Sequence, residues 1–161
     1  MMTEVTNRTF DEIVVGETAS VTRKLTATEV EALSLVAGDV EAFHLDLTGE
    51  AMTDEISAPA AAAIALVSGL LNRRLPGPGT AIVGTRFRYT GRVRIGDEVT
   101  ATVTAKSKQA DGRRIDFECR VTVPDGNVLV DGIATVAAPS RRLAYGDIAT
   151  PEVVLRRNDG L

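Results

Sequence analysis

One run of fourteen residues, APAAAAIALVSGLL over 58–71, constrains the fold of this chain more than any other feature. Its composition favours a helix, with Ser57 as a possible N-cap and Pro59 in the first turn. Arg73 and Arg74 suit the C-terminal end of such a helix. A helix that is apolar on every side must be surrounded by protein, and this run is too short to span a bilayer. The sequence therefore predicts a buried central helix and no membrane span.

Beyond this helix the hydrophobic period changes from helical to two. Four runs alternate apolar and polar residues, at 81–89, 99–106, 115–123 and 128–136. The segments QADGRR and PDGN, which separate the last three runs, are typical hairpin turns. Each strand then has one apolar face, and the helix needs to be covered. An antiparallel sheet wrapped around the helix satisfies both patterns, so the predicted fold class is α+β.

The N-terminal part adds two further elements. Residues 17–25 alternate well enough for a strand, and Thr26 with Glu29 forms a capping-box signature that begins a helix. Gly38 is expected to end this helix. From residue 139 the alternation stops and charge, glycine and proline increase. We therefore expect a single domain over 1–138 and a C-terminal tail or linker over 139–161.

Composition excludes several classes of function. The chain has 161 residues, enough for one domain with a hydrophobic core, and its formal charge of −4 does not suggest a nucleic-acid-binding surface. A single cysteine and a single histidine exclude an internal disulfide and a Cys/His zinc site, so no metal is expected. Cys119 falls on an apolar strand face and is interpreted as a structural thiol. The N-terminus does not resemble a signal peptide, which favours a cytoplasmic protein.

The segment AGDVEAFHLD, residues 37–46, contains the only histidine, His44. Asp39 lies five residues before it and Asp46 two residues after it. Taken alone, this spacing fits either a catalytic pair or a solvent-facing loop. Asp46 is interpreted as a solvated or capping carboxylate.

Four segments, taken in order, resemble the MaoC-like, (R)-specific enoyl-CoA hydratases of the hotdog fold. They are AGDVEAFHLD, the apolar helix ending in VSGLL, RLPGPGT, and FRYTGRVRIGDEVTATV, and the similarity runs from about Phe10 to Ala138. The resemblance implies a hotdog fold. It also implies the reversible addition of water to trans-2-enoyl-CoA, giving (R)-3-hydroxyacyl-CoA.

The resemblance also implies roles for individual residues. Asp39 and His44 correspond to the catalytic pair, which together activate water for attack at C3 and deliver a proton to C2. The backbone N–H of Ala60, at the start of the central helix, is expected to help bind the enolate oxygen. The other residues expected at the substrate are Ser68, Leu71, Gly77 and Arg86. Arg86 belongs to a set of arginines that fits either a phosphate-binding strip for coenzyme A or a solvated strand face, and the others are Arg88, Arg92 and Arg94. No cofactor is expected beyond the CoA thioester substrate itself.

The chain departs from the family pattern at two places. Glu41-Ala42 stands where the family has Asn-Pro, and Pro59-Ala60-Ala61 stands where it has His-Gly-Met. These departures motivate an alternative function, a catalytically weak acyl-CoA-binding module of a larger fusion. A phosphate acyltransferase domain is the possible fused or associated partner.

A third candidate function is a 3-hydroxyacyl-carrier-protein dehydratase. For all three candidates, the resemblance implies a homodimer or a higher even oligomer, in which strands of two copies form a continuous sheet.

Overall fold

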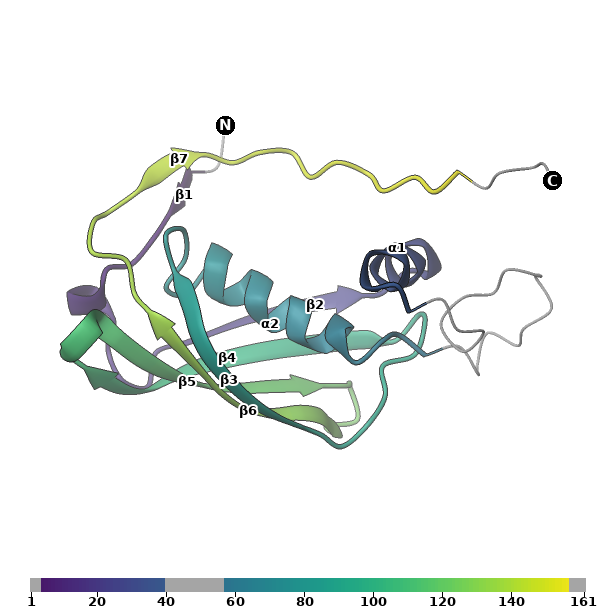
Figure 1. Cartoon of the computed structure of the whole chain (residues 1–161), viewed down its shortest axis with the longest axis horizontal. Helices are drawn as coiled ribbons and strands as arrows, with labels where there is room; N and C mark the ends of the chain where they lie inside the picture. The colour runs from purple at the N-terminus through teal and green to yellow at the C-terminus, as the bar shows by residue number, and fades with distance from the viewer. Residues whose placement is uncertain (1–3, 40–56, 157–161) are drawn as a thin grey trace.

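The computed structural model describes residues 4–39 and 57–156. A five-stranded antiparallel sheet curves beneath one long helix, as Figure 1 shows, and this confirms the predicted α+β architecture. The strand order is β2-β4-β5-β6-β3. The strands are β2 (Thr18–Lys24), β3 (Ala81–Tyr89), β4 (Glu98–Gln109), β5 (Arg114–Thr122) and β6 (Val128–Ala137).

Helix α2 (Ala61–Arg73) is the predicted central helix, and it packs against β2, β4 and β5. Its sheet-facing side chains, which include Val67 and Leu71, are buried. The opposite face is exposed in the single chain, at Ala61, Ala65, Gly69 and Asn72. Helix α2 is therefore not buried on every side within one copy of the chain, because a single sheet covers a helix from one side only.

The start of α2 also differs from the expectation. The N-cap residue is Ala60, and its side chain makes no capping hydrogen bond. Ser57 instead forms an isolated antiparallel bridge with Arg94. The expected Ser57 cap is wrong, because this bridge holds the serine in extended backbone before the helix begins.

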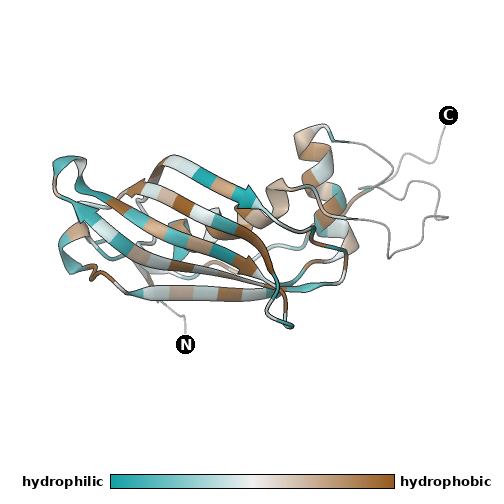
Figure 2. Cartoon of the chain, turned by 90° about the horizontal axis from the view of Figure 1, so that it is seen from below, coloured by the Kyte–Doolittle hydropathy of each residue, from teal (hydrophilic) through white to brown (hydrophobic). Residues whose placement is uncertain are grey.

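The hydrophobic core lies between α2 and the concave face of the sheet. Hydrophobic and hydrophilic residues alternate along the strands, as Figure 2 shows. The inward residues Val103, Phe117, Val121 and Val136 are fully buried. Cys119 belongs to the same layer, and burial raises the pKa of its thiol to about 12. A thiol that stays protonated in a packed core agrees with the structural interpretation.

Helix α1 (Ala27–Ala37) begins and ends where the sequence predicts. Thr26 and Glu29 form the complete capping box. Gly38 ends the helix in the left-handed conformation, with φ of 69°. These local signals determine where Asp39, the residue after Gly38, leaves the helix.

Two short strands near the ends of the chain pair with each other, which the sequence did not predict. Strand β1 (Glu4–Thr6) runs antiparallel to β7 (Ala144–Gly146). The 3₁₀ helices η1 (Phe10–Glu12) and η2 (Asp111–Arg113) complete the described elements. Strand β7 belongs to the segment interpreted as a tail, and the domain boundary at residue 138 stays a prediction.

Asn7 joins three segments that are far apart in the sequence. Its side chain is fully buried, and its Nδ2 donates to the carbonyl oxygens of Pro78 and Arg141, each at 2.9 Å. The backbone N–H of Leu143 donates to its Oδ1 at 2.8 Å. The amide therefore satisfies backbone groups that would otherwise lose their partners.

We expect Asn7→Ala to lower the free energy of unfolding by about 2 kcal/mol, because it removes three hydrogen bonds to backbone groups. Urea denaturation measures the change. Asn72→Ala is the control, because Asn72 is exposed on α2 and, among the described residues, its side chain bonds only within its own helix. Equal effects of the two substitutions would contradict this role of Asn7.

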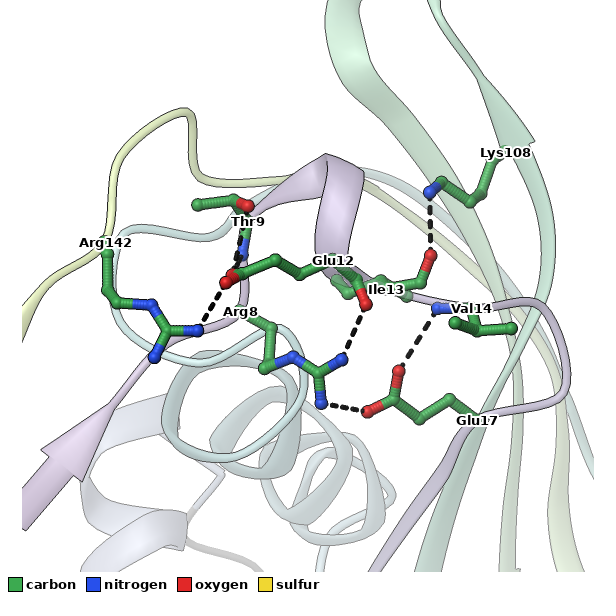
Figure 3. A network of polar contacts seen from close by, with 8 residues as sticks. All are labelled: Arg8, Thr9, Glu12, Ile13, Val14, Glu17, Lys108 and Arg142. Carbon is green, nitrogen blue, oxygen red and sulfur yellow. Dashed lines mark hydrogen bonds and ion pairs between the residues drawn. The ribbon is translucent and has the colours of Figure 1, made fainter.

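A polar network fastens η1 to the C-terminal segment (Figure 3). The Glu12 carboxylate accepts from the backbone N–H of Thr9 at 2.8 Å and from the Arg142 guanidinium. Arg8 donates to the Glu12 carbonyl and to the Glu17 carboxylate, each at 2.6 Å. The N–H of Thr9 and the charge-assisted bond from Arg142 lower the pKa of Glu12 from 4.5 to about 2.

This lowered pKa predicts a pH-dependent contribution to stability. The folded state holds Glu12 ionised more strongly than the unfolded chain does, so the contribution is present above pH 4.5 and is lost as the pH falls towards 2. We expect Glu12→Gln to lower Tm at neutral pH, and the difference from wild type to shrink over that range. Thermal melts across the range measure it, with Glu98→Gln on β4 as the control. A constant difference at every pH would contradict the prediction.

Among the described helices, none is both long and apolar enough to cross a membrane.

Candidate functional site

A cavity of about 560 Å³ lies where the end of α1, the start of α2 and the segment after β3 meet. Its described lining residues come from these three regions, from the last residue of β3 and from β6. They are Asp39, Ser57, Ala58, Pro59, Ala60, Ala63, Tyr89, Gly91, Arg92, Val93 and Val130.

Asp39 reaches this cavity because of the way α1 ends. The left-handed Gly38 reverses the chain, and its N–H donates to the Leu35 carbonyl at 3.2 Å. The N–H of Asp39 donates to the Ser34 carbonyl at 2.9 Å. Both bonds close the helix end, so the backbone of Asp39 is fixed and its half-buried side chain lines the cavity.

The start of α2 forms another wall of the cavity. The N–H of Ala58 donates to the Val93 carbonyl at 2.8 Å, and this bond fastens the segment before the helix to the chain after β3. No side chain of the described residues caps the helix. The first N–H groups of a helix have no intrahelical acceptor and carry the positive end of its dipole. Ala60 lies at this position and lines the cavity.

The remaining walls are mostly apolar, from Ala63, Val93 and Val130, and the rim carries Tyr89 and Arg92. Arg92 is predicted only as one arginine of the possible phosphate-binding strip, and no sequence prediction singles out Tyr89. The alternation of side chains along β3 predicts that Tyr89 faces inward at the end of the strand. This alternation is the one sequence signal that points to Tyr89 as a site residue.

The other residues expected at the substrate lie elsewhere. Leu71 is in the core with no exposed surface, and Ser68 is half-buried on α2, where its carbonyl accepts from Asn72. Gly77 is buried against Asn7, and its φ of +98° suits the turn that it makes. Arg86 is on the outer face of the sheet. The structure thus brings Asp39 and Ala60 together and places these four away from the cavity.

His44, Glu41 and Asp46 lie outside the described residues, so the proposed catalytic pair stays a prediction. The described residues contain no group of acidic, histidine and cysteine side chains suited to a metal ion.

The chemistry available in the cavity follows from Asp39 and the start of α2. A carboxylate can accept a proton from water, and the helix N-terminus can stabilise a negatively charged oxygen in apolar surroundings. This combination suits acid–base chemistry next to a carbonyl group.

Comparisons with known proteins agree on one family. The chain is 30% identical over 134 residues to an (R)-specific enoyl-CoA hydratase of Rhodospirillum rubrum, covering 82% of this chain and 92% of that protein. It is 31% identical over 128 residues to the (R)-specific enoyl-CoA hydratase of Aeromonas caviae, covering 78% and 95%. No family model matches the chain.

A solved structure supports the same relationship. The unliganded R-hydratase PhaJ1 from Pseudomonas aeruginosa superposes with a TM-score of 0.86 at 28% identity. The match covers 95% of this chain and 99% of that one. The similarity therefore includes the ends of the fold as well as its centre.

Proposed function

Because this chain belongs to the MaoC-like family of (R)-specific enoyl-CoA hydratases, we propose that it hydrates trans-2-enoyl-CoA reversibly to (R)-3-hydroxyacyl-CoA. The observation that carries the proposal is the shared cavity, which is lined both by the Asp39 side chain and by the start of α2, where no described side chain caps the helix. Hydration of an unsaturated thioester needs both a base and a site for the developing enolate oxygen.

In the proposed reaction, Asp39 and His44 hold one water molecule between them. The water oxygen attacks C3 of the enoyl thioester as one of its protons passes to the base, and a proton is delivered to C2 from the same side. The negative charge that develops on the thioester oxygen is stabilised by the backbone N–H at Ala60 and the dipole of α2. The water adds as H and OH across the double bond, so the reaction balances without a cofactor.

The test is the loss of enoyl-thioester absorbance when the protein is mixed with crotonyl-CoA, followed by chiral analysis of the 3-hydroxybutyryl product. The proposal expects turnover and the (R) product. No turnover, together with thermal stabilisation by crotonyl-CoA, would identify an acyl-CoA-binding module instead. Turnover of carrier-protein-linked crotonate but not of crotonyl-CoA would identify the carrier-protein dehydratase.

We also propose that the protein acts as a homodimer joined through β3. Every residue of β3 except Phe87 is exposed, and its outer edge pairs with no strand of the described residues. Ile82 and Val83 expose 36% and 53% of their surface. An unpaired apolar edge is a template for pairing with another strand. A second copy would extend the sheet, and its helix could cover the concave side of β3, which packs less against α2 of the same chain than β2, β4 and β5 do.

Val83→Lys is expected to shift the protein from dimer to monomer, because a lysine at the edge opposes strand pairing. Light scattering after size-exclusion chromatography measures the mass. Val15→Lys is the matched control, because Val15 exposes 55% of its surface and precedes β2 rather than lying on the β3 edge. A dimer that survives Val83→Lys, or a wild-type monomer, would contradict this interface.

The fused or associated phosphate acyltransferase domain and the cytoplasmic location stay predictions.

A further inference from the structure

The outer, convex face of the sheet contains a second hollow, of about 640 Å³. Strands β3, β4 and β5 each contribute one cation to it, which are Arg86, Lys106 and Arg114. Arg86 and Tyr89 are three residues apart on one strand, so their side chains point to opposite faces of the sheet. The hollow is therefore separate from the cavity that Asp39 lines.

The three cations differ from the other arginines of this face. Arg88 pairs with Asp131 at 2.8 Å, and Arg120 lies 3.7 Å from Glu118. Within the described part of the chain, the side chains of Arg86, Lys106 and Arg114 make no hydrogen bond or ion pair.

The only acid that lines the hollow among the described residues is Asp116, and its two oxygens are already bonded. Thr135 donates to Oδ1 at 2.6 Å and Ser107 donates to Oδ2 at 2.9 Å. These hydrogen bonds, and then the charges of Arg86 and Lys106, lower the pKa of Asp116, so the carboxylate stays ionised. Three cations and one anion leave the hollow with a net charge of +2.

We propose that this hollow binds a small anion with two or more phosphate charges. Guanidinium groups donate paired hydrogen bonds to phosphate oxygens, and an ammonium group adds a compact charge. Arg86 and Arg114 supply the first kind of donor and Lys106 the second. Gln109, which also lines the hollow, adds a neutral amide donor. A ligand of this charge would neutralise cations whose side chains make no hydrogen bond or ion pair within residues 4–39 and 57–156.

The phosphate groups could come from the nucleotide end of a CoA thioester or from a free phosphorylated metabolite. The binding site itself does not depend on the proposed hydratase activity.

The experiment is calorimetric titration with inorganic pyrophosphate and with adenosine 3′,5′-bisphosphate. Lys106→Gln/Arg114→Gln is expected to weaken binding by at least about tenfold, because each lost charge-assisted bond is worth about that factor. The matched control, Arg88→Gln/Arg120→Gln, removes the same charge from the same face and is expected to bind nearly as wild type. Thermal melts confirm that both variants fold, and the single variants Arg114→Gln and Arg120→Gln repeat the comparison on one strand.

Measurement of KM for two substrates identifies the source of the phosphate. If it is the substrate, Lys106→Gln/Arg114→Gln raises KM for crotonyl-CoA but not for crotonyl-pantetheine, which lacks the nucleotide. If it is a free metabolite, neither KM changes while pyrophosphate binding is lost.

Three results would overturn the inferred anion site: no binding to wild type, equal binding by the hollow variant, or equal loss in the control. If the protein binds pyrophosphate but does not turn over crotonyl-CoA, only the hydratase proposal is contradicted.

Discussion

Replacement of Asp39 by asparagine is expected to lower kcat for crotonyl-CoA by about 10³-fold while the protein stays folded. Asparagine has nearly the same shape but cannot accept the proton of the attacking water. The loss should fall on kcat more than on KM, because the carboxylate acts in the transition state. Initial rates over a range of crotonyl-CoA concentrations separate the two parameters.

Asp111→Asn is the control for this substitution, because Asp111 is exposed in the turn between β4 and β5. His44→Gln, measured alongside, is expected to give a loss of similar size if the two residues share one water. Should Asp39→Asn keep more than about a tenth of wild-type kcat, Asp39 would not be the general base.

Replacement of Gly132 by alanine is expected to lower the free energy of unfolding by about 3 to 5 kcal/mol. Gly132 pairs with Phe87 on one side and with Cys119 on the other, so it lies inside the sheet. A Cβ at this position would lie 2.1 Å from the Arg86 carbonyl oxygen and 2.8 Å from the Phe87 Cα. These neighbours are backbone atoms, and they cannot move without breaking the pairing of β3 with β6.

Gly84→Ala is the control, because Gly84 lies on the neighbouring strand and a Cβ there would meet nothing within 4 Å. Chemical denaturation of both variants measures the difference. Comparable stability of the two would show that β3 and β6 can separate at Gly132 at little cost.

The parts of the fold that the sequence predicts are those with local causes. Thr26, Glu29 and Gly38 define α1 through bonds within the helix and its ends. The Asp125-Gly126 turn joins β5 to β6, strands that are adjacent in both sequence and sheet. In each case a few neighbouring residues decide the structure, so their pattern is sufficient.

The parts that the sequence does not predict depend on distant segments. Strand β3 pairs with β6 and not with β4, the next strand along the chain. Strands β1 and β7 have three residues each, too few to show a period. Ser57 fits a helix cap by its position in the sequence, but its bridge to Arg94 places it outside the helix.

The candidate site divides in the same way. Asp39 could be predicted because it follows a helix-ending glycine and precedes the only histidine. The sequence predicts Arg86 as a contact to the phosphates of coenzyme A, but it does not show which face of the sheet Arg86 occupies, because that depends on the pairing of β3 at the sheet edge.

The position of β3 at the sheet edge has a consequence for synthesis of the protein. Strand β3 leaves the ribosome before β4, β5 and β6, yet among the described strands its only partner is β6. The nascent chain must therefore carry an unpaired strand, with Ile82 and Val83 exposed, until the last strand of the sheet is made. Arg86 and Arg88 place two positive charges on β3 while it is still unpaired, and such charges oppose aggregation. Slower synthesis of β4, β5 and β6 should consequently lengthen the time during which β3 can pair with other chains.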